Sequence, residues 1–253
     1  MDARKFESTE KLYHYTSFDN ALKILLSREL RFSRLSGMND IYESSKHIGI
    51  IGDCNNIADI TETFNKEIRG YQQISLSIDD HAKNRFGFDL PAMWGHYAEK
   101  GNGVCLVLNK KKLLKKLNAE WLCGTIVYED NLDNWILAPC SEITDINKVP
   151  AYIRKNREQL FLTKTKDWEY EQEFRIICQS SNQEYLSVKG CVMCVLLCHA
   201  DRDVPRIDHM TNILINTRVE VGTYCNWAGY KSIWGQDRTQ WYPYAERLAA
   251  PSE

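Results

Sequence analysis

The sequence predicts an α+β fold, a single domain over residues 1–253 built around a mixed, largely antiparallel sheet. The 253-residue chain has ordinary globular composition, with 43% hydrophobic and 26% charged residues. Short apolar runs typical of strands recur along it without regular βαβ alternation, which disfavours a doubly wound parallel sheet. The sequence has no internal repeat, low-complexity tract or linker-like stretch to divide it.

The predicted strands are short runs rich in β-branched, aromatic and other apolar residues. In chain order they cover residues 11–15, 30–33, 73–78, 103–109, 125–128, 174–178, 185–188, 191–197, 213–215 and 219–222.

The predicted helices follow start signals and apolar spacing. Ser17 or Asp19 is expected to cap a helix over 20–27, and Pro91 suits the first turn of a helix over 91–99. Further helices are expected at about 59–69, 110–117 and 149–163.

Charge and hydropathy exclude some classes of protein. A net charge of −2 and a pI of about 6.3 argue against nucleic-acid binding driven by a basic field, although a local basic groove stays open. The longest apolar runs fall short of the roughly 20 residues that span a bilayer. The first 15 residues lack the apolar core of a signal peptide. We therefore expect a cytoplasmic protein with no membrane partner.

The nine cysteines are expected to be reduced thiols. Cys191, Cys194, Cys198 and His199 could suggest zinc, but on a strand Cys191 and Cys194 point to opposite faces, and no second C-x-x-C completes a tetrahedral set. We favour a core strand and expect no metal site.

Three polar or aromatic groups are candidates for ligand contacts. His14, between Tyr13 and Tyr15 at the end of the first strand and followed by Thr16, can bind a ribose hydroxyl or be a core histidine. Asn39, in a polar loop, also suits an ordinary turn. Trp94 and Tyr97 share a helix face and can stack on a ligand ring or fill a core.

The segment from Lys164 to Arg175 is the most informative. If the strand extends back to Trp168, then Glu169, Glu171 and Glu173 project from one face, with Arg175 as their natural partner. The alternative is an exposed edge strand with a surface salt bridge.

Taken together, five segments carry a family resemblance: LYHYTSFDNALKIL, LRFSRLSGMNDIYE, ISLS, MWGHYAEKGNGVCLVL and KTKDWEYEQEFRII. In this order, over about Leu12 to Cys178, they resemble a widespread bacterial domain family of unknown function. That family is similar to a divergent branch of the ADP-ribosyltransferase fold, which includes DNA-modifying toxins and RNA 2'-phosphotransferases. The resemblance implies a sheet split around an NAD cleft.

The resemblance also implies roles for individual residues. His14 would hold a ribose of NAD, with Tyr15 and Thr16 beside it, and Trp94 or Tyr97 would contact the nicotinamide. Glu173 would be the catalytic carboxylate, with Glu171 fitting the same spacing. The remaining implied cofactor-binding residues are Ser77, Asn39 and Arg175. Ser75-Leu76-Ser77 is only a weak echo of the Ser-Thr-Ser strand found in arginine-modifying members.

The implied activity is cleavage of the nicotinamide–ribose bond of NAD, which is used as a substrate. Breaking this bond builds an oxocarbenium-like cation that a carboxylate can stabilise. Transfer to a protein or nucleic acid would be ADP-ribosylation, transfer to water would be NAD hydrolysis, and the role of a toxin or anti-phage effector follows by resemblance. The alternatives are a catalytically inactive nucleotide- or nucleic-acid-binding module of the same fold, or a protein-interaction module.

Overall fold

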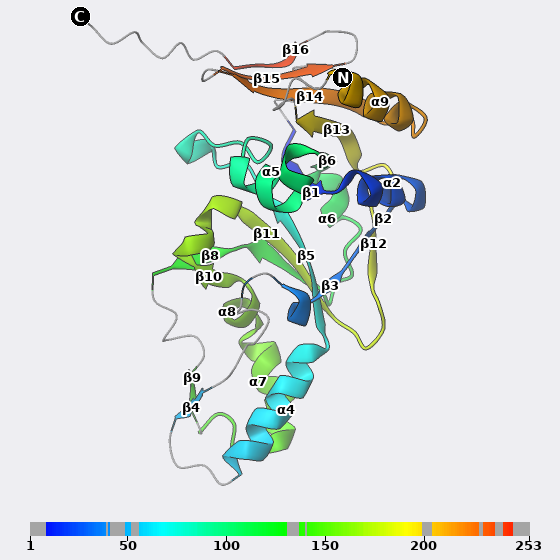
Figure 1. The fold of residues 1–253 in the computed structure, drawn as a ribbon. Coiled ribbons are helices and arrows are strands. Elements are labelled where there is room, and N and C mark those ends of the chain that lie inside the picture. The colour runs from blue at the N-terminus through cyan, green and yellow to red at the C-terminus, as the bar shows by residue number, and fades with distance from the viewer. Residues whose placement is uncertain are drawn as a thin grey trace, which may run out of the picture. The chain divides into compact units, whose positions relative to one another are not determined.

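The computed structural model describes residues 9–38, 40, 49–51, 56–130, 137–139, 141–198, 204–227, 230–235 and 240–244 (Figure 1). It confirms a mixed α+β fold with a largely antiparallel sheet. The chain forms two compact units, each assembled from separate segments. Unit 1 comprises Met1–Leu30, Leu76–Lys116 and Ser187–Glu253, and unit 2 comprises Arg31–Ser75 and Leu117–Leu186.

Most of the described strands match predicted ones, but residues 49–51, 137–139, 163–165, 230–235 and 240–244 form strands that were not predicted. The strands are β1 (Lys11–Thr16), β2 (Glu29–Arg31), β3 (Ser33–Arg34), β4 (Gly49–Ile51), β5 (Tyr71–Ser77), β6 (Val104–Asn109), β7 (Leu122–Thr125), β8 (Val127–Glu129), β9 (Leu137–Pro139), β10 (Thr163–Thr165), β11 (Glu173–Gln179), β12 (Tyr185–Ser187), β13 (Val192–Cys198), β14 (Glu220–Trp227), β15 (Tyr230–Gly235) and β16 (Gln240–Tyr244).

The α-helices lie close to their predicted places, except α9, for which no helix was predicted. They are α2 (Phe18–Ser27), α4 (Ile57–Arg69), α5 (Pro91–Tyr97), α6 (Lys110–Leu114), α7 (Val149–Lys155), α8 (Arg157–Phe161) and α9 (Val204–Ile215). Short 3₁₀ helices are η1 (Leu35–Gly37), η2 (His81–Lys83), η3 (Glu99–Gly101), η4 (Ile146–Lys148) and η5 (Lys166–Glu171).

Local chemistry explains the start and end of α2. The Ser17 hydroxyl accepts a hydrogen bond from the backbone N–H of Asn20 at 3.2 Å, which confirms Ser17 as the N-cap. Ala21, Ile24 and Leu25 are buried, as their spacing predicted. The helix ends at Arg28, whose φ of 60° is left-handed.

Three predicted elements differ from the structure. The segment 213–215, predicted as a strand, ends α9, because Ile207, Met210 and Leu214 bury one face at helical spacing. The predicted helix 149–163 is two helices, because Asn156 leaves helical geometry (φ −104°, ψ 15°). The predicted strand 125–128 is divided at Ile126, whose N–H bonds to the carbonyl of Glu173.

The sheet of unit 1 has the strand order β16-β15-β14-β13-β6-β1, and Tyr13 of β1 lies opposite Ser77 at the end of β5. Its pairings are antiparallel except β13 with β14. That parallel pair needs a crossover connection, which contains α9 (Figure 1). The prediction of a core strand around Cys194 is confirmed, since Cys191, Cys194 and Cys198 are all buried.

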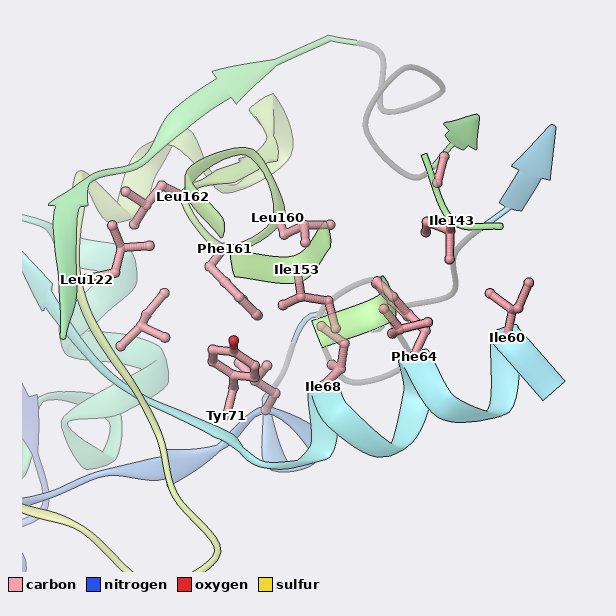
Figure 2. Close-up of a cluster of buried hydrophobic side chains, with 14 of the residues drawn as sticks. Ile60, Phe64, Ile68, Tyr71, Leu122, Ile143, Ile153, Leu160, Phe161 and Leu162 are labelled. Atoms are coloured by element: carbon pink, nitrogen blue, oxygen red, sulfur yellow. The ribbon is translucent and has the colours of Figure 1, made fainter. Parts of the chain in front are cut away.

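Unit 2 has the strand order β5-β11-β7, with β3 pairing on β5. Its core gathers where α4 and α7 pack together, as Figure 2 shows for Phe64, Ile68 and Ile153. The helical spacing of Ile60, Phe64 and Ile68 places all three on the buried face of α4. Tyr71, Phe161 and Leu162 continue this core toward β7 (Figure 2).

No helix among the described residues is both long and apolar enough to cross a membrane.

Candidate functional site

The acidic segment does not form the extended strand that its alternation predicted. Residues Lys166–Glu171 form a 3₁₀ helix, and β11 begins only at Glu173. Gln172, between them, has a left-handed φ of 47°, which reverses the chain locally. The prediction that Glu169, Glu171 and Glu173 share a strand face is therefore wrong. The turn nevertheless leaves Glu171 and Glu173 in contact with one cation.

That cation is Lys164 on β10, and with Arg175 it completes a charged cluster: Lys164, Glu171, Glu173 and Arg175. The ammonium Nζ of Lys164 lies 2.7 Å from Oε2 of Glu171 and 3.5 Å from Oε2 of Glu173. Arg175 donates to Glu173 through two N–H groups, Nε to Oε1 at 2.8 Å and Nη2 to Oε2 at 2.7 Å. The predicted pairing of Arg175 is confirmed for Glu173, in the bidentate form typical of guanidinium groups.

The charged cluster is buried, so the predicted alternative of an exposed edge strand is wrong. Arg175 is 0% exposed, Glu173 2%, and Lys164 and Glu171 4% each. Two cations and two carboxylates give no net charge, which is the condition under which burial of so many ionic groups is tolerated. The third N–H contact of Arg175 runs from Nη1 to the carbonyl of Phe161 at 2.8 Å.

The partners of Glu173 keep it ionised. Burial by itself raises the pKa of the Glu173 carboxyl, but the charge and hydrogen bonds of Arg175, then the charge of Lys164 and a hydrogen bond with the Ser75 side chain, outweigh it and lower the pKa to about 2. The carboxylate is therefore ionised throughout the neutral range. Its pKa also makes it a weak proton acceptor.

Two polar side chains outside the acidic segment complete this environment. Tyr128 on β8 accepts a hydrogen bond at its hydroxyl oxygen from the backbone N–H of Glu173 at 2.9 Å, and burial raises its pKa well above the usual range. Gln73 Nε2 donates to the hydroxyl of Ser75 at 3.2 Å. Ser75 is exposed, so it is the solvent-facing end of the chain of contacts to Glu173.

An aromatic surface borders the charged cluster. The Lys164 ammonium lies 4.4 Å from the centroid of the Trp168 ring, a cation–π distance. The rings of Trp168 and Tyr170 have centroids 6.0 Å apart, and both side chains are half-buried. A ligand at this edge would find an apolar ring beside fixed charges.

In unit 1, the residues predicted around His14 lie on both faces of β1. Tyr15 is 6% exposed and its hydroxyl donates to the carbonyl of Gly87 at 2.6 Å. Burial is the main reason that the pKa of Tyr15 is well above its usual value. His14 and Thr16 occupy the opposite face by strand alternation, with His14 half-buried.

The end of β1 is closely packed. A Cβ on Gly103 would lie 2.3 Å from the backbone oxygen of Thr16 and 2.9 Å from the backbone of Ala98. Only glycine permits this approach. The turn before β6 therefore lies directly against the predicted cofactor-binding residue Thr16.

The aromatic residues of α5 contribute to an aromatic cluster of unit 1, made of Tyr15, Phe88, Trp94 and Tyr224. Trp94 is 4% exposed, donates from Nε1 to the carbonyl of Phe88 at 2.9 Å, and stacks on Tyr224 with centroids 5.9 Å apart. Trp94 was expected either to stack on a ligand ring or to fill a core, and in unit 1 it fills the core. Tyr97 is half-buried and packs against the same cluster.

Ser77 has an unused hydrogen-bonding group. Its side chain is 1% exposed, and its hydroxyl has no hydrogen-bond partner among the described residues. An unpaired buried hydroxyl carries a desolvation cost that a bound polar group would remove. Asn39 lies outside the described residues, as does His199.

The structure thus brings together Glu171, Glu173 and Arg175 in unit 2, and Tyr15 with Trp94 in unit 1. Sequence reasoning missed Tyr128, which is 45 residues from Glu173 and carries no local signal. Among the described residues, no group of three or more histidine, cysteine, aspartate or glutamate side chains is close enough together to hold a metal ion.

Comparison with known families gives one match. A family model described as a protein of unknown function (DUF2971) matches residues 93–176, which is less than half of the chain. The matched segment contains Trp94 and Tyr97 as well as all four members of the charged cluster. Searches of curated proteins and of solved structures find no match.

Proposed function

We propose that this protein is an NAD-dependent enzyme of the ADP-ribosyltransferase type, in which Glu173 stabilises positive charge on the ribose. The observation that carries the proposal is the geometry of Glu173: a carboxylate fixed by two N–H groups of Arg175 and by the Lys164 ammonium, whose charges lower its pKa and keep it ionised. Preorganised charge in a water-poor site is the usual largest contribution to catalysis of this kind. The proposal rests equally on the family resemblance of the five sequence segments.

The reaction breaks the bond between the nicotinamide nitrogen and C1' of the ribose. The bonding electron pair leaves with the nicotinamide, which becomes neutral, and C1' becomes cationic. An acceptor oxygen or nitrogen then attacks C1' and loses its proton. Because Glu173 is a weak base, we assign it the electrostatic role and assign the proton to water.

The other residues take the roles that the resemblance implies. His14 and Thr16 bind a ribose of NAD, and the unpaired hydroxyl of Ser77 offers a further polar contact. Since Trp94 is a core residue, the half-buried Tyr97 is the better candidate for contact with nicotinamide. Arg175 and Lys164 are positioning residues for Glu173.

One observation favours a second function, a catalytically inactive nucleotide-binding module of the same fold. A carboxylate offers about four acceptor sites, and Glu173 has four donors: two from Arg175, one from Lys164 and one from Ser75. With its charge balanced and 2% of its surface exposed, it can serve the fold alone.

The experiment that separates the two functions measures nicotinamide release from NAD labelled in the nicotinamide ring, with and without cell lysate as a source of acceptor. The enzyme predicts release above a protein-free blank, reduced about 100-fold or more in Glu173→Gln. Glu158→Gln, an exposed carboxylate on α8, is the matched control and should retain the full rate.

Two outcomes would overturn the enzymatic proposal: no release by the wild type under either condition, or an unchanged rate in a folded Glu173→Gln protein. Since Glu173→Gln alters a buried network, its folding is checked by circular dichroism. His14→Ala gives an independent test in unit 1. Its affinity for NAD in calorimetry should fall, and equal affinity would remove His14 from the site.

A further inference from the structure

Unit 2 contains a pocket of about 410 Å³ at the far end of β11 from the charged cluster. Ile177, Cys178 and Gln179 of β11 form one wall. At about 3.3 Å per residue, Gln179 lies roughly 13 Å along the strand from Arg175. The pocket is thus a separate feature, with a volume in the range that holds small organic molecules.

Aromatic rings line the inner part of this pocket. Tyr71 and Phe161 contact each other, with ring centroids 4.4 Å apart and an interplanar angle of 32°, and Figure 2 shows them together beside Leu122. Trp121, the third ring of the lining, is half-buried and is held edge-on against Phe32 at 4.9 Å. Phe161 is 0% exposed and Tyr71 7%, so Trp121 is the ring most open to a planar ligand, and its packing keeps the entropic cost of binding low.

Two arginines supply positive charge at the same pocket. Arg154 near the end of α7 is exposed, and Arg157 at the start of α8 is half-buried, with Nη1 donating to the carbonyl of Glu120 at 3.3 Å. Their charge reaches the Tyr71 hydroxyl: burial and then Glu67 raise the pKa of Tyr71, whereas both arginines oppose the rise.

Carboxylates near the pocket offset the charge of the two arginines. Glu120 is in the lining, so the lining itself carries two cations and one carboxylate. Glu67 lies outside the lining and accepts a hydrogen bond from Nε2 of Gln179 at 3.0 Å. Because Glu67 also acts on Tyr71 and Glu184 on Cys178, the pocket has no net positive charge, and the arginines offer positive charge locally, at their guanidinium groups.

We propose that this pocket binds a small phosphorylated aromatic molecule of the size of a nucleoside monophosphate. Guanidinium groups match phosphate oxygens in charge and in fork geometry. The ring of the ligand would lie against Trp121 and the small exposed part of Tyr71. The carboxylate of Glu120 and the amide of Gln179 offer an acceptor and a mixed donor–acceptor for the polar edge of a base.

This proposal does not depend on the proposed NAD reaction, because no residue of the pocket belongs to that site. One residue connects the two regions: Phe161 belongs to the pocket lining, and its backbone carbonyl accepts a hydrogen bond from Arg175. The probe is chosen accordingly. Uridine monophosphate lacks the nicotinamide and adenine of NAD but shares its ribose and phosphate, so variants of the pocket and of His14 are needed to assign its binding.

Isothermal titration calorimetry of the full chain with uridine monophosphate tests the proposal. We expect saturable binding with a Kd of about 1 mM or tighter. Uridine, which lacks the phosphate, and inorganic phosphate, which lacks the ring, should each bind at least ~10-fold more weakly. This is expected if both the arginines and the aromatic side chains contribute to binding.

Variants locate the binding. Arg154→Gln and Arg157→Gln should each weaken binding of uridine monophosphate at least ~10-fold, the scale of a charge-assisted hydrogen bond. Lys155→Gln removes the same charge from the next residue of α7, outside the pocket lining, and should bind as the wild type does. His14→Ala should also leave the binding of uridine monophosphate unchanged.

The proposal is overturned if the wild type shows no binding at ~10 mM ligand, or if uridine binds as tightly as its phosphate. It is equally overturned if Lys155→Gln weakens binding as much as Arg154→Gln does, because the charge effect would then be unspecific. All variants change surface or half-buried side chains, so thermal melts should coincide with that of the wild type.

Discussion

The charged cluster of unit 2 and the aromatic cluster of unit 1 both contain residues predicted to bind or act on a ligand, yet they are buried by different chemistry. In the aromatic cluster each polar side-chain group donates to one neutral or acidic acceptor: Tyr15 to the carbonyl of Gly87, Trp94 to the carbonyl of Phe88, and Tyr224 to the carboxylate of Asp89. In the charged cluster each group depends on ions of opposite sign.

The difference shows what each region contributes. Aromatic rings gain stability simply by leaving water. Ion pairs gain little, because the cost of desolvating the charges offsets their attraction. A fold that needed only stability at β11 could use apolar side chains there, so the presence of four buried ionic groups makes the charged cluster the better candidate for function.

The largest effect is expected from breaking the charged cluster on one side. Arg175→Met leaves Glu173 buried with only Lys164 to balance two carboxylates, so the free energy of unfolding should fall by about 3–5 kcal/mol. Urea titration followed by circular dichroism measures it. The double variant Glu173→Met, Arg175→Met removes both charges and should recover most of the loss; if it is as unstable as the single variant, charge imbalance is not the cause.

A drop in pH should weaken the charged cluster selectively. The folded-state pKa of Glu173, about 2, lies below the ordinary value of 4.5, so its contribution to stability is complete above pH ~4.5 and is lost as the pH falls toward 2. By pH 3 we expect the wild type to lose about 2 kcal/mol more than the Met/Met double variant. Parallel losses in the two proteins would contradict the assigned pKa.

The aromatic cluster should respond more mildly to loss of one polar atom. Tyr15→Phe removes the hydroxyl that satisfies the carbonyl of Gly87, at a cost of about 1–2 kcal/mol in unfolding free energy. The measurement is again denaturant unfolding. A loss as large as that of Arg175→Met would remove the distinction between the two clusters.

The smallest effect is expected outside both clusters, from the ion pair of Lys155 with Glu142. Its N–O distance is almost the same as that of the buried pair of Lys164 with Glu171. Lys155 lies 2.8 Å from Glu142, but its side chain is 68% exposed, whereas Lys164 lies 2.7 Å from Glu171 and is buried. Lys155→Met should change the unfolding free energy by less than about 0.5 kcal/mol, and Lys164→Met by several times more. Equal changes would show that burial does not decide the strength of these pairs.

Much of the fold could be predicted from residue spacing. The period of apolar residues located α2 and α4, and Ser17 marked where α2 begins. The run Ile213-Leu214-Ile215 was misread because a short apolar run lacks the length to distinguish a strand from the end of a helix. The left-handed turn at Gln172 could not be predicted, since glutamine rarely adopts it and no Gly or Asn stands there.

The site was predictable only where its members are close in the chain. Glu173 and Arg175 are two residues apart, and strand geometry alone places them on one face. The contribution of Tyr128 arises from pairing of β8 with β10, which brings residues together that local patterns do not connect. The resemblance to the ADP-ribosyltransferase fold stays a prediction, and the nicotinamide assay is its test.

Arg175 also has a mechanical consequence. By bonding at once to Glu173 and to the carbonyl of Phe161, its guanidinium closes the base of the segment 162–174, much as a covalent staple closes a loop. The exposed Lys166 at the tip of that segment should therefore resist tryptic cleavage at neutral pH. Unlike a disulfide, this closure needs no oxidant and would open reversibly in acid.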